Sequence, residues 1–277
     1  MPDGGKRWKS ALTLECAART DIGLVRRRNE DFLWVDAKRG WLLLADGMGG
    51  HSSGDLASAL AVNYVLGGLL VAAEKSGNFD YVSALANSVV DANTAIRNAG
   101  KQSDANHSMG ATFVGALLSP DEMAYAYIGD SRLYLLRDGI LAQLSRDHTL
   151  VQEFVDAGQL TIEMAQNHPY RGLLTRGLGV HDEVKPETGI CALRPRDRLL
   201  LCTDGLTDMA DEHEIARLLG MPVQADEVAG SLIEAAKSAG GRDNVSVIVA
   251  WFDDQVRYDD DRCAGSAHHR MNVNGCK

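Results

Sequence analysis

The sequence has few cysteines, and their spacing matches no familiar framework. The five cysteines (16, 191, 202, 263 and 276) include no Cys-x-x-Cys pair, and their number is odd. A disulfide scaffold is therefore not indicated, and we expect reduced thiols in a cytoplasmic protein.

Long apolar runs and an excess of basic charge are also missing. No run of 18 apolar residues occurs, and the first ten residues, MPDGGKRWKS, contain no apolar core of signal-peptide length. We therefore expect neither a membrane span nor a leader. The chain carries 38 acidic and 28 basic residues, a net charge of -10. This balance argues against nucleic acid or an anionic membrane as partner, and it permits a site that concentrates cations.

Nucleotide-binding motifs are incomplete as well. Residues 41–56 read as an apolar strand, a glycine-rich turn and the start of a helix, as a nucleotide-binding unit would. The third glycine of a dinucleotide fingerprint is replaced by Ser52, and the lysine of a phosphate-binding loop is absent. Asp46 in the turn would also repel a pyrophosphate in the absence of a metal. A nucleotide-binding protein is therefore the weaker interpretation.

The stretch at 41–51, WLLLADGMGGH, is instead typical of a buried strand that ends in a carboxylate. Apolar residues 41–45 predict the strand, and the glycines after Asp46 permit close approach of a ligand to the backbone. From residue 54 the spacing becomes helical, and it predicts a helix over 54–73 with Leu56, Leu60, Ala61 and Tyr64 on its buried face.

Further periodic segments follow along the 277 residues, of which 45% are hydrophobic. This is enough for a large core in one or two domains. Strands are predicted at 12–20, 32–35, 111–118, 122–128, 133–137, 140–144, 198–202 and 245–251, and helices at 81–99, 149–157, 161–167, 211–219 and 224–239.

Acidic residues recur at the ends of these strands or at kinks in the sheet. The set is Glu30, Asp31, Asp46, Asp130, Asp204 and Asp243. A single Asp-Gly pair is more often a turn than a ligand, but several converging carboxylates would repel one another unless cations neutralise them. Oxygen ligands without His or Cys favour Mg²⁺ or Mn²⁺ over Zn²⁺. Two such ions about 3.5–4 Å apart can activate a bridging water and hold a phosphoryl group, and arginine is its natural partner.

Seven segments, in order, resemble those of the PPM-type, metal-dependent protein phosphatases, also called the phosphatase 2C family, in their compact bacterial form. They are TDIGLVRRRNED (20–31), LADGMGGH (44–51), MGAT (109–112), IGDSR (128–132), SRDHT (145–149), LCTDGLTD (201–208) and GGRDNVS (240–246). The series spans residues 12 to about 252. Each segment alone is weak, but the ordered set is specific.

The resemblance implies a role for each acid. Asp46 would bridge two metal ions, and Asp204 and Asp243 would complete the shell of one of them. Glu30 and the Gly47 carbonyl would hold the second ion, largely through waters, and Asp31 would orient a metal-bound water. In bacterial members a third, looser ion is held by the aspartate that matches Asp130, together with Asp204.

The resemblance also points to the phosphate ligand and leaves the proton donor open. Arg26 matches the phosphate-binding arginine, whereas Arg27 and Arg28 match nothing and are expected to be surface charge. Met48 stands where eukaryotic relatives carry the histidine that is their candidate general acid. His51 is a substitute candidate, although a structural role for it is equally compatible.

We therefore expect an α/β (α+β) fold, a four-layer α-β-β-α sandwich of two mostly antiparallel sheets flanked by helices. One domain would cover residues 10–253, with a flap at 146–180 and a disordered tail at 254–277. The expected activity is hydrolysis of phosphoserine and phosphothreonine in proteins by a monomer that opposes a bacterial kinase. A catalytically inactive scaffold that binds phosphoproteins is the alternative. It would be expected to lack a metal ligand, and none is missing.

Overall fold

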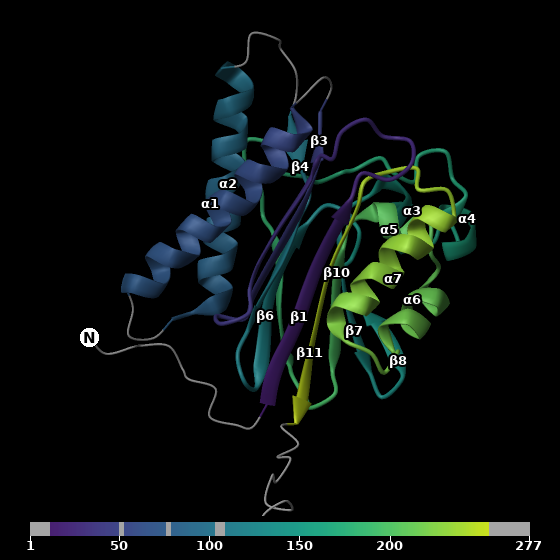
Figure 1. The fold of residues 1–277 in the computed structure, drawn as a ribbon. Helices are drawn as coiled ribbons and strands as arrows, with labels where there is room; N and C mark the ends of the chain where they lie inside the picture. The colour runs from purple at the N-terminus through teal and green to yellow at the C-terminus, as the bar shows by residue number, and fades with distance from the viewer. Residues whose placement is uncertain (1–11, 50–52, 76–78, 103–108, 255–277) are drawn as a thin grey trace, which may run out of the picture.

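The computed structural model describes residues 12–49, 53–75, 79–102 and 109–254, which form two stacked sheets with helices on both outer faces (Figure 1). Every strand pair within the sheets is antiparallel. The first sheet has the order β1 (Leu12–Asp21), β11 (Val245–Asp254), β10 (Arg198–Cys202), β7 (Arg132–Arg137) and β8 (Ile140–Gln143). The second has the order β2 (Asp31–Asp36), β3 (Trp41–Met48), β5 (Phe113–Leu118), β6 (Glu122–Ile128) and β9 (Glu187–Ala192), with β4 (Gly110–Ala111) paired to β3.

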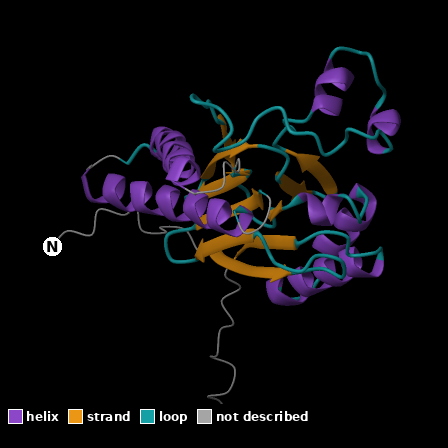
Figure 2. Ribbon diagram, turned by 90° about the horizontal axis from the view of Figure 1, so that it is seen from above, coloured by secondary structure: helices purple, strands orange, loops and turns teal. Residues whose placement is uncertain are grey.

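Helices cover the two outer faces of this pair of sheets. They are α1 (Gly54–Lys75), α2 (Tyr81–Gln102), α3 (Leu150–Asp156), α4 (Ile162–Gln166), α5 (Asp204–Thr207), α6 (Glu212–Leu219) and α7 (Ala225–Ser238). Helices α1 and α2 lie against the second sheet, and α6 and α7 against the first (Figure 1). The short helices α3 and α4 extend away from the sandwich (Figure 2).

Three apolar clusters hold the four layers together. One packs α1 and α2 on the second sheet, one packs α6 and α7 on the first, and the third fills the space between the sheets. In the middle cluster Leu42 and Leu44 of β3 meet Leu199 and Leu201 of β10, all fully buried. Strands covered on both faces read as continuous apolar runs, which is why 41–45 shows no alternation. The predicted four-layer fold is confirmed.

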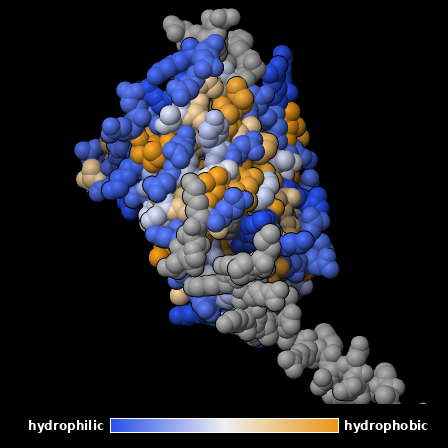
Figure 3. Space-filling model, turned by 90° about the vertical axis from the view of Figure 1, so that its left-hand side faces the viewer, coloured by the Kyte–Doolittle hydropathy of each residue, from blue (hydrophilic) through white to orange (hydrophobic). Residues whose placement is uncertain are grey.

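Three expectations need correction. Strand β9 was not predicted, nor was the single-turn helix α5. The predicted inner face of α1 is wrong in part, because Leu56 and Tyr64 are 49% and 48% exposed while Ala57 and Val65 are fully buried. Figure 3, which faces the α1–α2 side, shows apolar patches on this surface.

The sequence predicted no membrane span. By length and composition alone, Gly54–Glu74 of α1 is long and apolar enough to be one. One third of its most apolar window is buried inside the protein, where α1 packs on β3 and α2. The predicted disordered tail lies outside the described residues except for Asp254, which ends β11.

Candidate active site

The hairpin of β2 and β3 places two of the predicted acids side by side. Its register sets Asp31 directly opposite Asp46 at the open end of the two strands. At the closed end, the backbone N–H groups of Lys38 and Arg39 donate to the carboxylate of Asp36 and form the turn. Because directly opposite residues in an antiparallel pair are about 5 Å apart, the hairpin alone brings two carboxylates together.

Thr112 fixes the backbone of Asp46 from the neighbouring strand. The Asp46 N–H donates to Thr112 Oγ1 at 3.1 Å, and the Thr112 N–H donates to the Asp46 carbonyl at 2.8 Å. The Thr112 hydroxyl also contacts Ser131 Oγ at 2.7 Å, in the residue that follows Asp130. The threonine of the MGAT segment thereby connects the Asp46 and Asp130 positions.

Glu30 and the Gly47 carbonyl converge on one small space in front of α1. The Gly47 N–H donates to the Glu30 carbonyl at 3.0 Å. A Cβ placed on Gly54 would lie 2.8 Å from both Glu30 Oε2 and the Gly47 carbonyl oxygen, so these two oxygens face the same point. A side chain at Gly47 would itself collide with the Gly54 carbonyl oxygen at 2.0 Å. Both glycines are therefore required by close approach.

Asp31 is buried between the two sheets and is held by hydroxyl groups of the opposite sheet. Ser246 Oγ donates to Asp31 Oδ2 at 2.6 Å, and Thr203 Oγ1 donates to the same oxygen at 3.1 Å. The other oxygen, Asp31 Oδ1, is buried and has no hydrogen-bond partner. The same holds for Asp204 Oδ1. A buried carboxylate oxygen without a partner is costly, and bound cations are one way to satisfy it.

Asp204 and Asp243 reach the same place from the first sheet. Asp204 begins α5 directly after β10, and Asp243 precedes β11. The neighbour of Asp243, Asn244, donates from Nδ2 to the carbonyls of Ile22 and Arg28 and accepts from the Glu30 N–H at 2.8 Å. Asn244 thereby ties the loop that carries Glu30 to the end of β11.

Arg26 extends from that loop over the acids. Its Nη2 donates to Asp243 Oδ2 at 2.5 Å, and its side chain is half exposed. Arg27 and Arg28 are also exposed but do not line the cavity.

One cavity of about 470 Å³ collects most of the predicted site. Its lining includes Arg26, Glu30, Asp46, Gly47, Asp130, Asp204 and Asp243. Asp31 lies behind Asp46 rather than in the wall. Met48 lines the cavity, whereas His51, the candidate proton donor, lies outside the described residues.

The predicted flap forms the opposite wall. Residues 172–177 and Val180 line the cavity, and Ala111 of β4 exchanges two backbone hydrogen bonds with Leu178. On the far side, the guanidinium of Arg171 pairs with the carboxylate of Asp208, just beyond α5. The flap therefore contacts β4 on one side of the site and the residue after α5 on the other.

The carboxylates disfavour their own ionisation. Burial raises the pKa of Asp46 and of Asp204 well above the usual range, and neighbouring aspartates raise both further. Burial raises the pKa of Asp130 to about 7, with repulsion from Asp147 adding to it. Burial likewise raises the pKa of Asp31 to about 6. Several neighbouring acids with raised pKa values are typical of functional sites.

In the described residues no group of three or more His, Cys, Asp or Glu side chains is arranged as a ready-made metal site. Asp243 is paired with Arg26. The donor chemistry nevertheless fits hard divalent cations: the cavity holds five carboxylates with high charge density, a converging carbonyl, and the unpartnered oxygen of Asp204.

Four residues that position the acids were not predicted: Thr112, Thr203, Asn244 and Ser246. All four stand inside the seven segments as polar residues, and Thr203 and Asn244 are next to an acid. That placement was the available signal. Their partners could not be read from it, because Asn244 binds residues more than 200 positions away.

Known proteins share both sequence and fold with this chain. The family model described as protein phosphatase 2C matches residues 26–231. The serine/threonine protein phosphatase PstP of Mycobacterium tuberculosis (strain H37Rv) is 42% identical over 248 residues, which are 90% of this chain and 46% of PstP. The chain thus spans about half the length of that curated relative.

Two solved structures agree with the match. The crystal structure of M. tuberculosis PstP/Ppp has a TM-score of 0.79 at 41% identity, covering 87% of this chain and 99% of that one. The catalytic domain of PstP in complex with two manganese ions has a TM-score of 0.77 at 40% identity, covering 88% of this chain and all of that one. The family model covers more than half of the chain, including Arg26 and Asp204, so the chain belongs to the protein phosphatase 2C family.

Proposed function

We propose that the protein is a metal-dependent protein-serine/threonine phosphatase that hydrolyses phosphoserine and phosphothreonine in proteins. The observation that carries the proposal is the cavity in which five carboxylates and Arg26 face one space. Family membership and the manganese-bound PstP domain support it.

The acids divide between two ions in this proposal. Asp46 would contribute to both ions. Asp204 and Asp243 would hold one ion, and Glu30 with the Gly47 carbonyl would hold the other. The pair is Mn²⁺ or Mg²⁺, and a third ion would lie between Asp130 and Asp204. When bound, these ions lower the pKa of a water molecule and neutralise phosphoryl charge.

The protein's own groups orient the reaction. Asp31, fixed by Ser246 and Thr203, keeps a carboxylate behind Asp46 and limits the directions that the Asp46 side chain can take. Arg26 presents a planar fork to the phosphate oxygens, for which it would exchange its partner Asp243. The site is therefore built for direct attack by water, without a covalent phosphoenzyme.

The proposal is tested by hydrolysis of phosphoserine and phosphothreonine peptides in excess Mn²⁺ and in EDTA. We expect turnover with Mn²⁺ and none after chelation. A phosphoprotein-binding scaffold, the alternative, would bind the peptides in Mn²⁺ without releasing phosphate. Hydrolysis that survives chelation would contradict the metal mechanism.

Arg26 is expected to matter far more than the arginine beside it. Arg26→Ala should lower kcat/KM for a phosphopeptide by about 10²-fold, since a charge-assisted contact to a phosphoryl group is worth roughly 2–4 kcal/mol in a site of this kind. Arg27→Ala is the matched control, with the same charge change one residue away and no place in the cavity lining. Equal losses in the two variants would show that the loop's overall charge acts, rather than Arg26.

The partners follow from the same proposal. A phosphoprotein substrate implies a kinase that supplies it, and we propose that the protein opposes a bacterial Ser/Thr kinase. Phosphoproteomics of cells carrying Asp204→Asn would show which proteins gain phosphate. The monomeric state and the cytoplasmic location stay predictions.

A further inference from the structure

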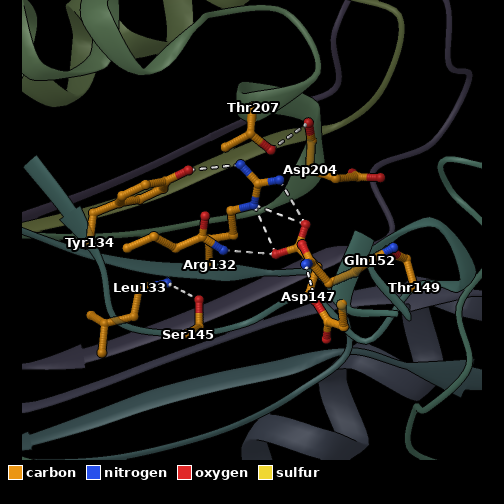
Figure 4. A network of polar contacts seen from close by, with 11 residues as sticks. Arg132, Leu133, Tyr134, Ser145, Asp147, Thr149, Gln152, Asp204 and Thr207 are labelled. Carbon is orange, nitrogen blue, oxygen red and sulfur yellow. Dashed lines mark hydrogen bonds and ion pairs between the residues drawn. The ribbon is translucent and has the colours of Figure 1, made fainter. Parts of the chain in front are cut away.

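The segment 145–149, SRDHT, lies across the turn 129–132 that carries Asp130. Its first residue makes the first contact, because the Leu133 N–H donates to Ser145 Oγ at 2.9 Å (Figure 4). Ser145 is buried and follows β8 after Leu144, so the contact anchors the segment to the start of β7. The segment belongs to the family pattern.

Asp147 binds the residue at one end of the turn. Arg132 Nε and Nη2 donate to the two Asp147 oxygens at 2.9 and 2.7 Å, a bidentate pair (Figure 4). The remaining Nη1 donates to the hydroxyl of Tyr134 at 2.8 Å, and Gln143 Nε2 donates to Asp147 at 2.9 Å. Both partners of the pair are largely buried. A bidentate Arg–carboxylate pair fixes orientation as well as distance.

His148 binds the residue at the other end of the turn. The backbone N–H of His148 donates to the Gly129 carbonyl at 3.0 Å, and the backbone N–H of Gly129 donates to the ring Nδ1 of His148 at 3.0 Å. The ring stacks on Tyr127 with centroids 5.4 Å apart. These contacts hold both the backbone and the ring of His148 against the end of β6.

Both nitrogens of the His148 ring face an N–H donor. Burial, with the nearby Arg176 charge, lowers the pKa of His148 to about 4, so the ring is neutral at pH 7. A neutral ring accepts a hydrogen bond at one nitrogen only. When Nδ1 accepts from Gly129, the proton is on Nε2, and Arg176 Nη1, 3.0 Å from Nε2, makes no hydrogen bond with the ring. The contact with Gly129 is the one that reaches the Asp130 turn.

The same segment also contacts residues 172–177, the part of the flap that lines the cavity. The Thr175 N–H donates to the His148 carbonyl at 2.9 Å, and next to the segment the Leu150 N–H donates to the Leu173 carbonyl at 2.9 Å. Residues 145–150 thus bind the Asp130 turn on one side and the cavity-lining part of the flap on the other.

We propose that Asp147 and His148 are positioning residues that clamp the Asp130 turn at both ends and so set the direction of the Asp130 carboxylate. The inference rests on the proposed function, in which Asp130 helps hold a divalent ion. Asp130 itself is buried, and its two neighbours in the chain are Gly129, held by His148, and Ser131, held by Thr112. The clamp leaves the turn little freedom.

Two substitutions of His148 separate the clamp from simple packing. Asparagine places its side-chain oxygen near the position of Nδ1 and can still accept from Gly129, whereas glutamine places its amide near the position of Nε2. We expect His148→Gln to weaken the Asp130-dependent Mn²⁺ binding by about 10–100-fold, the usual cost of losing a group that orients a ligand. His148→Asn should stay within about three-fold of the wild type in the same calorimetric titration.

The Arg132 end has a matched control on the same strand. Arg132→Lys removes the bidentate contact to Asp147 and should weaken Mn²⁺ binding about ten-fold. Arg137 makes the same bidentate pair with Asp197 at the other end of β7 (2.7 and 2.6 Å). Arg137→Lys should therefore lower the unfolding temperature without changing Mn²⁺ binding. This pair decides the question if His148→Gln does not fold.

An Asp130→Asn background completes the experiment. If the clamp acts through Asp130, adding His148→Gln or Arg132→Lys to Asp130→Asn should change Mn²⁺ binding less than two-fold. Additive losses, equal effects of Arg132→Lys and Arg137→Lys, or wild-type binding in His148→Gln would overturn the clamp. If the wild type neither binds Mn²⁺ nor hydrolyses phosphopeptides, the proposed function fails instead.

Discussion

Replacing Asp46 with asparagine is expected to reduce kcat for phosphopeptide hydrolysis by on the order of 10³-fold, the upper end of what losing one electrostatic stabiliser costs. Asp46 is the acid on which the others converge. It faces Asp31 across the hairpin, and Asp204, Asp130 and Asp243 all raise its pKa. An uncharged amide at this position leaves both proposed ions short of one shared ligand.

The same substitution should have the opposite effect on the stability of the chelated protein. In EDTA, Asp46→Asn removes a buried group that other carboxylates repel, so the unfolding temperature should rise by a few degrees, as about 1 kcal/mol does for a domain of this size. A substitution that lowers activity and raises stability is expected where like charges are held together in an active site. Both readouts come from one variant, and they must move in opposite directions.

Asp36→Asn is the matched control for this prediction. Asp36 belongs to the same hairpin, at its closed end, and pairs with Arg39 rather than facing the cavity. It should leave kcat unchanged and lower the unfolding temperature slightly. Loss of activity in both variants would mean that the hairpin, and not the Asp46 carboxylate, is needed. Full activity in Asp46→Asn would remove Asp46 from the mechanism.

The acids could be predicted from the sequence because each one lies at or near the end of a strand. Strand ends on one edge of a sandwich meet in space, so Asp46, Asp204 and Asp243 could be grouped from the sequence alone. What joins them is hydrogen bonding between distant segments. Neither the link from Thr203 and Ser246 to Asp31 nor the pairing of Arg26 with Asp243 leaves a periodic signal in the chain.

The errors in the predicted fold also have physical causes. Helix α1 carries no charged residue between positions 56 and 73, so its apolar spacing gives no contrast between inner and outer faces. Strand β9 follows Pro186 and contains Gly189, and it forms the edge of its sheet with alternating half-buried and exposed residues. An edge strand needs few apolar residues, and its sequence resembles a loop.

A rise in pH should destabilise the metal-free protein, whereas bound metal should stabilise it. Without metal, the pKa of Asp130 is raised to about 7 in the folded protein, and those of Asp46 and Asp204 are raised well above the usual range. The folded state therefore binds more protons than the unfolded state, whose carboxylates ionise near pH 4. Stability that is present at low pH is lost as pH rises through these values.

Between pH 6.5 and 8 these acids make the larger contribution to the pH dependence of stability. Burial lowers the pKa of His148 to about 4, so its opposite contribution grows up to the unfolded-state pKa of about 6.5 and levels off above it. From there to pH 8 the chelated protein should lose about 1 kcal/mol for each carboxylate with a pKa near 7. The unfolding temperature in EDTA should fall by several degrees over this range, and Asp130→Asn should reduce the slope.

Excess Mn²⁺ should reverse the sign of that slope. Metal binding requires ionised ligands and releases their protons, so affinity grows as pH rises through the same window. At an ion concentration one hundred times the Kd, binding stabilises the folded protein by about 2.7 kcal/mol, and the unfolding temperature should rise by roughly 5–10 °C. Thermal unfolding at three pH values, each with EDTA and with Mn²⁺, gives two curves that diverge as pH increases. Parallel curves would mean that the ions bind away from the raised carboxylates, because only ligands that lose protons on binding couple the two effects.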